Sequence, residues 1–260
     1  MIYLGPQLYT VREFTQSEAG IEETFKKCHE AGYETVQLSG NAHIPAENMK
    51  ALMEKYEIRV CCTHTPFDRL QNDLDEVIRE HLYLGIPVIG LGSAPRDYTK
   101  DNDSLTEFIG ILNGIAHMIK QAGLQFAYHN HSTEFQKYNG VTMFDRLLSE
   151  TDPEEVHFIP DTFWLQMGGV TPANFLRNKL KGRVEVCHFK DLAVENHQPV
   201  FAEVGEGNLD LLECFKACQE IGVTSIVIEQ DVCPRDPFDC LANSYKNLMK
   251  LAYEAGDRTK

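Results

Sequence analysis

Four segments in the second half of the sequence each place an ionisable side chain at the end of a short apolar run. They are FAYHNHSTEF with Glu134, VHFIPDTFW with Asp161, VEVCHFKDL with His188, and SIVIEQD with Glu229. A β-branched or aromatic run of about five residues that stops at such a side chain is typical of a buried barrel strand whose carboxyl end carries chemistry. Any one of the four could be an ordinary satisfied polar residue, but four at matching positions predict one shared site.

The types of these side chains indicate a divalent metal centre. Two Glu, one Asp and one His offer mostly oxygen donors, which favours Mn²⁺ or Mg²⁺ over a thiolate zinc site, with Co²⁺ and Zn²⁺ as further options. Such a cation stabilises the negative charge that forms on oxygen when a proton leaves the carbon beside a carbonyl. Glu134 and Glu229, on roughly opposite sides of a barrel mouth, are candidates for both ligand and proton-moving base.

Other polar and aromatic residues near these run ends are candidates for contacts with a substrate. Lys190 could bind a substrate hydroxyl or act as an acid near the reacting carbon, and a plain surface lysine is the alternative. His129 and His131 are separated by one residue and would lie on the same face of a continuing strand. For all of these residues an ordinary structural role is the competing interpretation. The candidate substrate contacts are His64, His129, His131, Trp164 and Glu206.

A fold that gathers several strand ends is needed to bring these residues together. Short apolar runs alternate with amphipathic helical segments along the whole chain. The predicted strands lie near residues 2–8, 33–38, 58–63, 87–92, 124–129, 156–160, 184–188 and 225–229. The predicted helices lie near residues 18–31, 46–56, 69–85, 102–122, 141–149, 172–180, 208–221 and 238–255. Eight such pairs predict one α/β domain over residues 1–260, a (β/α)8 TIM barrel with its site at the carboxyl ends of the strands.

The positions of the long loops and the composition of the chain further restrict the location of the site and the possible classes of function. The longest irregular stretches, 39–45, 93–101, 131–140 and 191–207, all follow predicted strands and so gather at the same end as the ligands. A net charge of −15 opposes binding to nucleic acid. The first residues show no export signal, and no apolar stretch is long enough for a membrane span. The eight cysteines form no C-x-x-C pair, so we expect a cytoplasmic protein without disulfides.

The chain resembles the sugar phosphate isomerase/epimerase superfamily. These are the xylose isomerase-like barrels, which include inosose dehydratase and ketose 3-epimerases. The most specific matching segments are QLYTVR, YHNHSTEF, PDTFWLQMGGVTP, HFKDL, GEGNLD and IEQD. The resemblance implies one divalent cation on Glu134, Asp161, His188 and Glu229, and a role for Glu206 at the rim. Other branches of the family carry the first glutamate earlier, where this chain has Phe126 and Ala127, so Glu134 or His131 must fill that corner.

The resulting hypothesis is a metal-dependent sugar isomerase, epimerase or dehydratase that acts on a small sugar or keto-sugar. The sequence does not choose among these reactions, and it leaves open the phosphorylation of the substrate and the formation of a homo-oligomer. One alternative is a non-catalytic barrel that binds a sugar or serves as a partner subunit, but such a barrel has no need of clustered carboxylates. An abasic-site endonuclease needs more histidines at strand ends than this chain supplies, and the acidic charge disfavours it.

Overall fold

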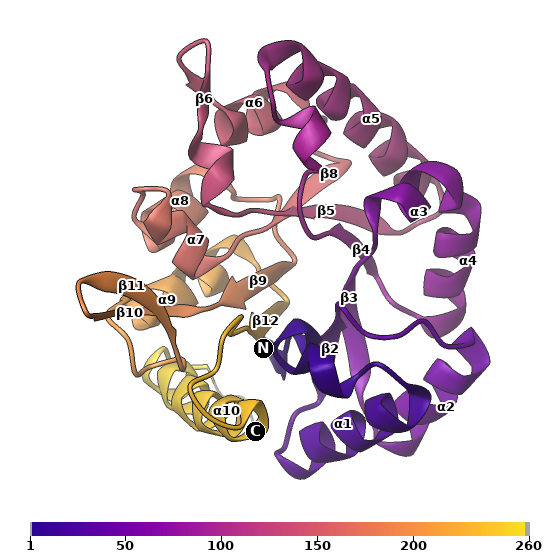
Figure 1. Ribbon diagram of the computed structural model, residues 1–260, viewed down its shortest axis with the longest axis vertical. Helices are drawn as coiled ribbons and strands as arrows, with labels where there is room; N and C mark the ends of the chain where they lie inside the picture. Colours follow the sequence, from indigo (N-terminus) through magenta and orange to yellow (C-terminus); the bar gives the residue numbers. More distant parts are fainter. Residues whose placement is uncertain (1, 258–260) are drawn as a thin grey trace.

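The computed structural model describes residues 2–257 and consists of parallel strands surrounded by helices (Figure 1). Eight parallel strands form the centre of the molecule, and each overlaps one of the eight apolar runs predicted as strands. These strands are β1 (Tyr3–Pro6), β2 (Thr35–Leu38), β3 (Arg59–His64), β4 (Val88–Leu91), β5 (Gln125–His129), β8 (Val156–Ile159), β9 (Val186–Phe189) and β12 (Ser225–Ile228). The strand prediction is therefore confirmed.

The strands are arranged as two hydrogen-bonded sheets that meet at two seams. One sheet has the order β2-β3-β4-β5-β8, and the other has the order β1-β12-β9. At one seam β1 lies beside β2, and a single bridge pairs Gln7 with Gln37. At the other seam β8 lies beside β9, and a single bridge pairs Asp161 with His188. The order around the axis is that of the predicted TIM barrel.

Helices follow the strands and cover the outside of the barrel (Figure 1). The longer ones are α1 (Glu18–Glu30), α2 (Ala46–Lys55), α4 (Leu74–Leu84), α5 (Asn102–Gln121), α6 (Met143–Glu150), α8 (Pro172–Lys179), α9 (Leu211–Ile221) and α10 (Pro237–Glu254). Short helices are η1 (Leu8–Phe14), α3 (Phe67–Asn72), η2 (Arg96–Tyr98), η3 (Ser132–Phe135) and α7 (Thr162–Met167). Within residues 2–257, no helix combines the length and the apolar character that crossing a bilayer requires.

Three details of the sequence prediction are corrected. The single helix expected over 69–85 is split at Asp73, where φ is −129°, because Asn and Asp favour turns over helix interiors. A hairpin over 137–142 begins in the stretch 131–140, and a second hairpin over 191–202 lies within the stretch 191–207, although both stretches were expected to be irregular. These hairpins are β6 (Lys137–Tyr138) with β7 (Val141–Thr142), and β10 (Asp191–Glu195) with β11 (Gln198–Ala202). Their two-residue turns have positive φ at both positions, at Asn139-Gly140 and Asn196-His197, as tight hairpins require.

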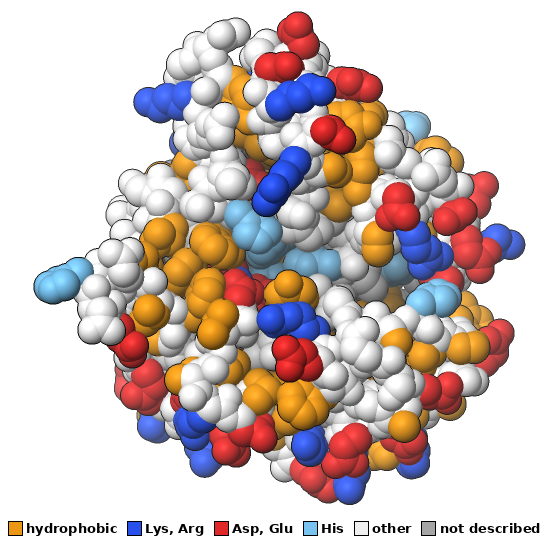
Figure 2. Space-filling view, viewed as in Figure 1, with side chains coloured by type: hydrophobic (Ala, Val, Ile, Leu, Met, Phe, Trp, Pro, Cys, Tyr) orange, Lys and Arg blue, Asp and Glu red, His pale blue; other side chains and the backbone are white. Residues whose placement is uncertain are grey.

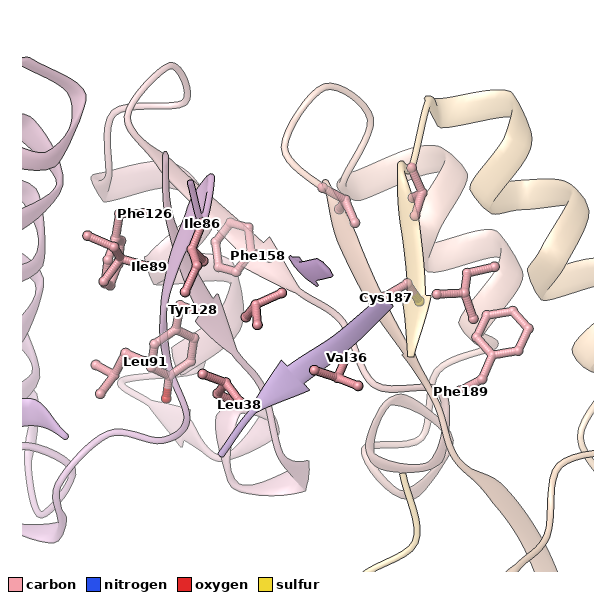
Figure 3. Close-up of a cluster of buried hydrophobic side chains, with 14 of the residues drawn as sticks. Val36, Leu38, Ile86, Ile89, Leu91, Phe126, Tyr128, Phe158, Cys187 and Phe189 are labelled. Carbon is pink, nitrogen blue, oxygen red and sulfur yellow. The ribbon is translucent and has the colours of Figure 1, made fainter. Parts of the chain in front are cut away.

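Two hydrophobic cores lie on the two faces of the strands. The outer core lies between strands and helices and includes Ile89, Phe126, Phe158 and Phe189 (Figure 3). The inner core fills the barrel and consists of small and branched residues. Its members are Cys61, Cys62, Val88, Ala127, Ile159, Val186 and Val227. Side chains alternate along a regular strand, so Ala127, Ile159, Val186 and Val227 indicate which of their neighbours also face the axis. The adjacent Cys61 and Cys62 both belong to the inner core because the register of β2 and β3 shifts beside them.

Candidate metal centre

Four buried side chains at the carboxyl ends of neighbouring strands converge on one point. His129, Asp161, His188 and Glu229 each offer a donor atom, and these atoms all lie within 4.8 Å of one another. Histidine side chains gather in the hollow at the centre of the face shown in Figure 2. The sequence predicted three of these four residues as metal ligands. The fourth position is held by His129, which the sequence suggested only as a substrate contact.

The alternation of side chains explains why these four residues meet. Each stands two residues after a member of the inner core: His129 follows Ala127, Asp161 follows Ile159, His188 follows Val186, and Glu229 follows Val227. Residues two apart on a strand share a face, so all four point toward the barrel axis just above the inner core. The strand geometry therefore fixes the direction of the donors.

The hydrogen bonds of the two histidines turn their free nitrogens toward the carboxylates. His129 Nδ1 lies 3.0 Å from the carbonyl oxygen of Gly92, which can only accept, so this nitrogen carries the proton and Nε2 is left free. His129 Nε2 lies 3.5 Å from Asp161 Oδ2. His188 Nε2 donates to Gln37 Oε1 at 2.7 Å, and His188 Nδ1 faces Glu229 Oε2 at 3.0 Å. Four electron-rich atoms thus face one another, an arrangement that a cation stabilises.

Burial and neighbouring charges shift the pKa values of all four groups. Burial lowers the pKa of His129 to about 4 and also lowers the pKa of His188, so both imidazoles are neutral near pH 7. Burial acts to raise the pKa of Glu229, but the Lys190 ammonium and His188 together hold it well below its usual value. Burial raises the pKa of Asp161, and the Lys190 ammonium opposes that rise.

Lys190 is buried beside the cluster and is not a surface lysine. Its side chain is 1% exposed, and its Nζ lies 3.2 Å from Asp161 Oδ2 and 2.9 Å from Glu229 Oε2. The carboxylate of Asp231, which sequence reasoning did not single out, lies 3.1 Å from the same ammonium. Burial acts to lower the pKa of Lys190, but the nearby carboxylates hold it above its usual value, so the side chain stays charged.

Glu134, predicted as a ligand and as a base, lies outside the cluster. Its Oε1 accepts a hydrogen bond from the Tyr128 hydroxyl at 2.6 Å, and its Oε2 accepts from the His131 backbone N–H at 2.8 Å and the Thr133 hydroxyl at 3.0 Å. Glu134 thereby caps the short helix η3, and its backbone N–H in turn donates to the His131 side chain. Its role in this geometry is to hold His131 in place.

A cavity of about 660 Å³ opens above the donors and is lined by several of the predicted substrate contacts. His64, His129 and His131 line it, together with Glu229 and Asp231. Burial lowers the pKa of His131 to about 3 and that of His64 well below its usual value, so this wall presents neutral imidazoles. Trp164 lies behind the wall, with its ring centroid 5.3 Å from that of His131.

Glu206, predicted as a substrate contact at the rim, is exposed and faces helix α10. Its carboxylate accepts a hydrogen bond from Asn247 Nδ2 at 2.9 Å. The glycines on either side of it donate their backbone N–H groups to Asp191 Oδ2, at 2.9 Å for Gly205 and 3.0 Å for Gly207. The GEG segment is therefore a loop wrapped around a buried aspartate.

Two glutamines that sequence reasoning missed support the cluster from β1 and β2. Gln7 Nε2 donates to Glu229 Oε1 at 3.1 Å, and Gln37 accepts from His188. Both are almost fully buried. The available signal was a polar residue directly after β1, for Gln7, and a polar residue within β2, for Gln37.

Comparison with known proteins agrees with this architecture. A model of the xylose isomerase-like TIM barrel family matches residues 25–237. Inosose dehydratase from Lacticaseibacillus casei is 30% identical over 148 residues, which are 50% of this chain and 48% of that protein. The chain thus spans about half the length of this curated relative.

Solved structures show the same fold along nearly the whole chain. A sugar phosphate isomerase/epimerase from Parabacteroides distasonis superposes with a TM-score of 0.77 at 22% identity, covering 99% of this chain and 94% of that one. The IOLI protein, in a structure with a bound zinc atom, superposes with a TM-score of 0.73 at 12% identity, covering 98% and 99%. The family match, the barrel and the strand-end site lead to one conclusion: this chain belongs to the xylose isomerase-like TIM barrel family.

Proposed function

We propose that this chain is a metal-dependent enzyme that removes a proton from the carbon beside a carbonyl group of a sugar or keto-polyol. The observation that carries the proposal is the convergence of two imidazole nitrogens and two carboxylates within 4.8 Å at the barrel mouth. Membership of a family with inosose dehydratase relatives supports the substrate class. Isomerisation, epimerisation and dehydration share this first step, and these relatives favour dehydration as the outcome.

The donor set supports a metal of intermediate hardness. With His129 in the position that the sequence gave to Glu134, the site offers two imidazoles and two carboxylates in place of three carboxylates and one imidazole. Imidazole suits Mn²⁺, Co²⁺ and Zn²⁺ better than it suits Mg²⁺, which prefers oxygen donors. We therefore rank Mn²⁺, Co²⁺ and Zn²⁺ ahead of Mg²⁺. When bound, such a cation would stabilise negative charge on the substrate oxygens.

The residues of the chain supply the remaining steps. Glu229 lines the cavity, and the adjacent Lys190 ammonium keeps it ionised, so its carboxylate is the proposed base. His131 accepts a hydrogen bond from the Glu134 backbone, which leaves its other ring nitrogen to donate to a substrate oxygen or to a departing hydroxyl.

The test is proton exchange in D₂O. Protein loaded with Mn²⁺, Co²⁺ or Zn²⁺ is incubated with an inosose and with a panel of ketoses and oxidised sugars, and deuterium uptake is followed by mass spectrometry. We expect one carbon of at least one member to be labelled, even where net turnover is slow. Glu229→Gln should abolish labelling, while Glu107→Gln, an exposed change on α5, should leave it intact.

The outcomes separate the proposed enzyme from a binding protein. Labelling by the wild type and by Glu229→Gln alike would exclude Glu229 as the base. A metal-loaded protein that labels no member of the panel but binds one of them would indicate the non-catalytic alternative.

A further inference from the structure

The Lys190 ammonium contacts the oxygen atoms that a metal in this site would use. Asp161 Oδ2 and Glu229 Oε2 are the carboxylate oxygens that face the free nitrogens of His129 and His188. They are also the oxygens that lie 3.2 Å and 2.9 Å from Lys190 Nζ. A divalent cation on either oxygen would stand next to the ammonium, and two positive charges at such short range repel each other.

The position of Lys190 is fixed by the fold. Its backbone N–H donates to Thr162 Oγ1 at 3.0 Å, and the same hydroxyl donates back to the Lys190 carbonyl oxygen at 2.8 Å. The aromatic rings of Trp164 and Phe201 flank the ammonium, with centroids 5.3 Å and 5.5 Å from Nζ. The side chain is 1% exposed.

Asp231 offers the ammonium a second partner. Both of its carboxylate oxygens lie close to Nζ, at 3.3 Å and 3.1 Å. Asp231 is not one of the four converging donors, so an ammonium held by Asp231 leaves the metal ligands free. The three carboxylates and the one ammonium together carry two net negative charges, which a single divalent cation balances.

We propose that Lys190 sets the metal affinity of the site by competing with the cation for Asp161 and Glu229, and that Asp231 restrains this competition by holding the ammonium aside. This inference rests on the proposed metal centre. It makes Lys190 a positioning residue that limits how tightly the metal is held and keeps the buried charge near balance. It also gives Asp231 a role through Lys190 in addition to its place in the cavity wall.

The experiment measures Mn²⁺ binding to the metal-stripped 260-residue protein by isothermal titration calorimetry at fixed pH. Lys190→Met keeps the length of the side chain and removes its charge, so affinity should rise at least tenfold. Asp231→Asn should lower affinity several-fold, because the ammonium then rests on Asp161 and Glu229 alone. In the double variant the effect of Asp231→Asn should shrink, since Asp231 acts through Lys190. Lys179→Met, which removes an exposed lysine of α8, is the matched control and should not change the affinity.

The outcomes test the competition by Lys190 separately from the existence of the metal centre. Equal or weaker Mn²⁺ binding by Lys190→Met than by wild type would overturn the competition while leaving the metal centre in place. If Lys190→Met does not fold, as judged by circular dichroism, Asp231→Asn decides the matter, and unchanged affinity in that variant would also overturn the inference. Failure of wild type and all variants to take up Mn²⁺, Co²⁺ or Zn²⁺ would remove both this inference and the proposed function.

Discussion

Replacing His129 and replacing Glu134 should have different effects on metal binding, and the two variants together test the position of the metal centre. His129→Ala removes one of four converging donors, whereas Glu134→Gln alters a carboxylate that caps η3. Loss of a group that merely supports a ligand costs roughly 10- to 100-fold in metal affinity. Loss of His129 itself should cost at least about 100-fold, which corresponds to roughly 2.7 kcal/mol.

Glu134→Gln should instead reduce stability. The Glu134 side chain is 2% exposed and accepts from the Tyr128 hydroxyl, the Thr133 hydroxyl and the His131 backbone. An amide group turns one acceptor into a donor, and one buried hydrogen bond left unmade costs about 1–3 kcal/mol. For a chain of this size a cost of about 2 kcal/mol lowers the Tm by roughly 4–8 °C. Metal affinity should change less than about tenfold.

Isothermal titration with Mn²⁺ and differential scanning calorimetry of metal-free protein measure the two effects separately. Our reasoning is refuted if Glu134→Gln loses the metal while His129→Ala keeps it. That result would restore the ligand set predicted from the sequence.

Three further predictions concern stability and ligand removal. Gly207→Ala should lower the Tm, because a Cβ at this position would stand 2.4 Å from Asp191 Oδ1. Gly110→Ala, in open space on α5, should be neutral or stabilising. Thermal melts of the two variants measure the difference. Burial lowers the pKa of His131 to about 3 in the folded protein. Below pH about 6.5 the unfolded chain therefore binds a proton at His131 that the folded chain does not bind. Stability should therefore fall as the pH drops from about 6.5 toward 3, and urea titrations across this range should show a shallower fall in His131→Asn. Asp161→Asn keeps an oxygen to cap α7 but removes a negative ligand, so it should fold and yet show no rise in Tm when Mn²⁺ is added.

The barrel could be predicted from the sequence because each strand is buried on both faces and appears as a short apolar run. The sequence predicted Asp161, His188 and Glu229 as ligands because each is an ionisable residue at the end of a short apolar run. The hairpins were missed, although Asn139-Gly140 is a strong signal for a tight turn.

The sequence predicted Glu134 or His131 at this corner of the site, whereas His129 is the residue that stands among the four converging donors. Counting in steps of two from Ala127 leads to His129, whereas Glu134 lies beyond the end of β5 in η3. The contact between Lys190 and Asp231 could not be predicted from the sequence, because it joins the residue after β9 to the loop after β12.

Because each donor stands two residues beyond an inner-core residue, this protein should tolerate insertions and deletions in some segments and not in others. Removing one residue within β5, β9 or β12 would turn His129, His188 or Glu229 away from the axis and into the layer of helices. Lengthening the loops beyond these donors would leave their directions unchanged, because the paired strands set them. Changes in chain length should therefore accumulate in the loops beyond the donors, such as the β6–β7 and β10–β11 hairpins, while the donors keep their geometry.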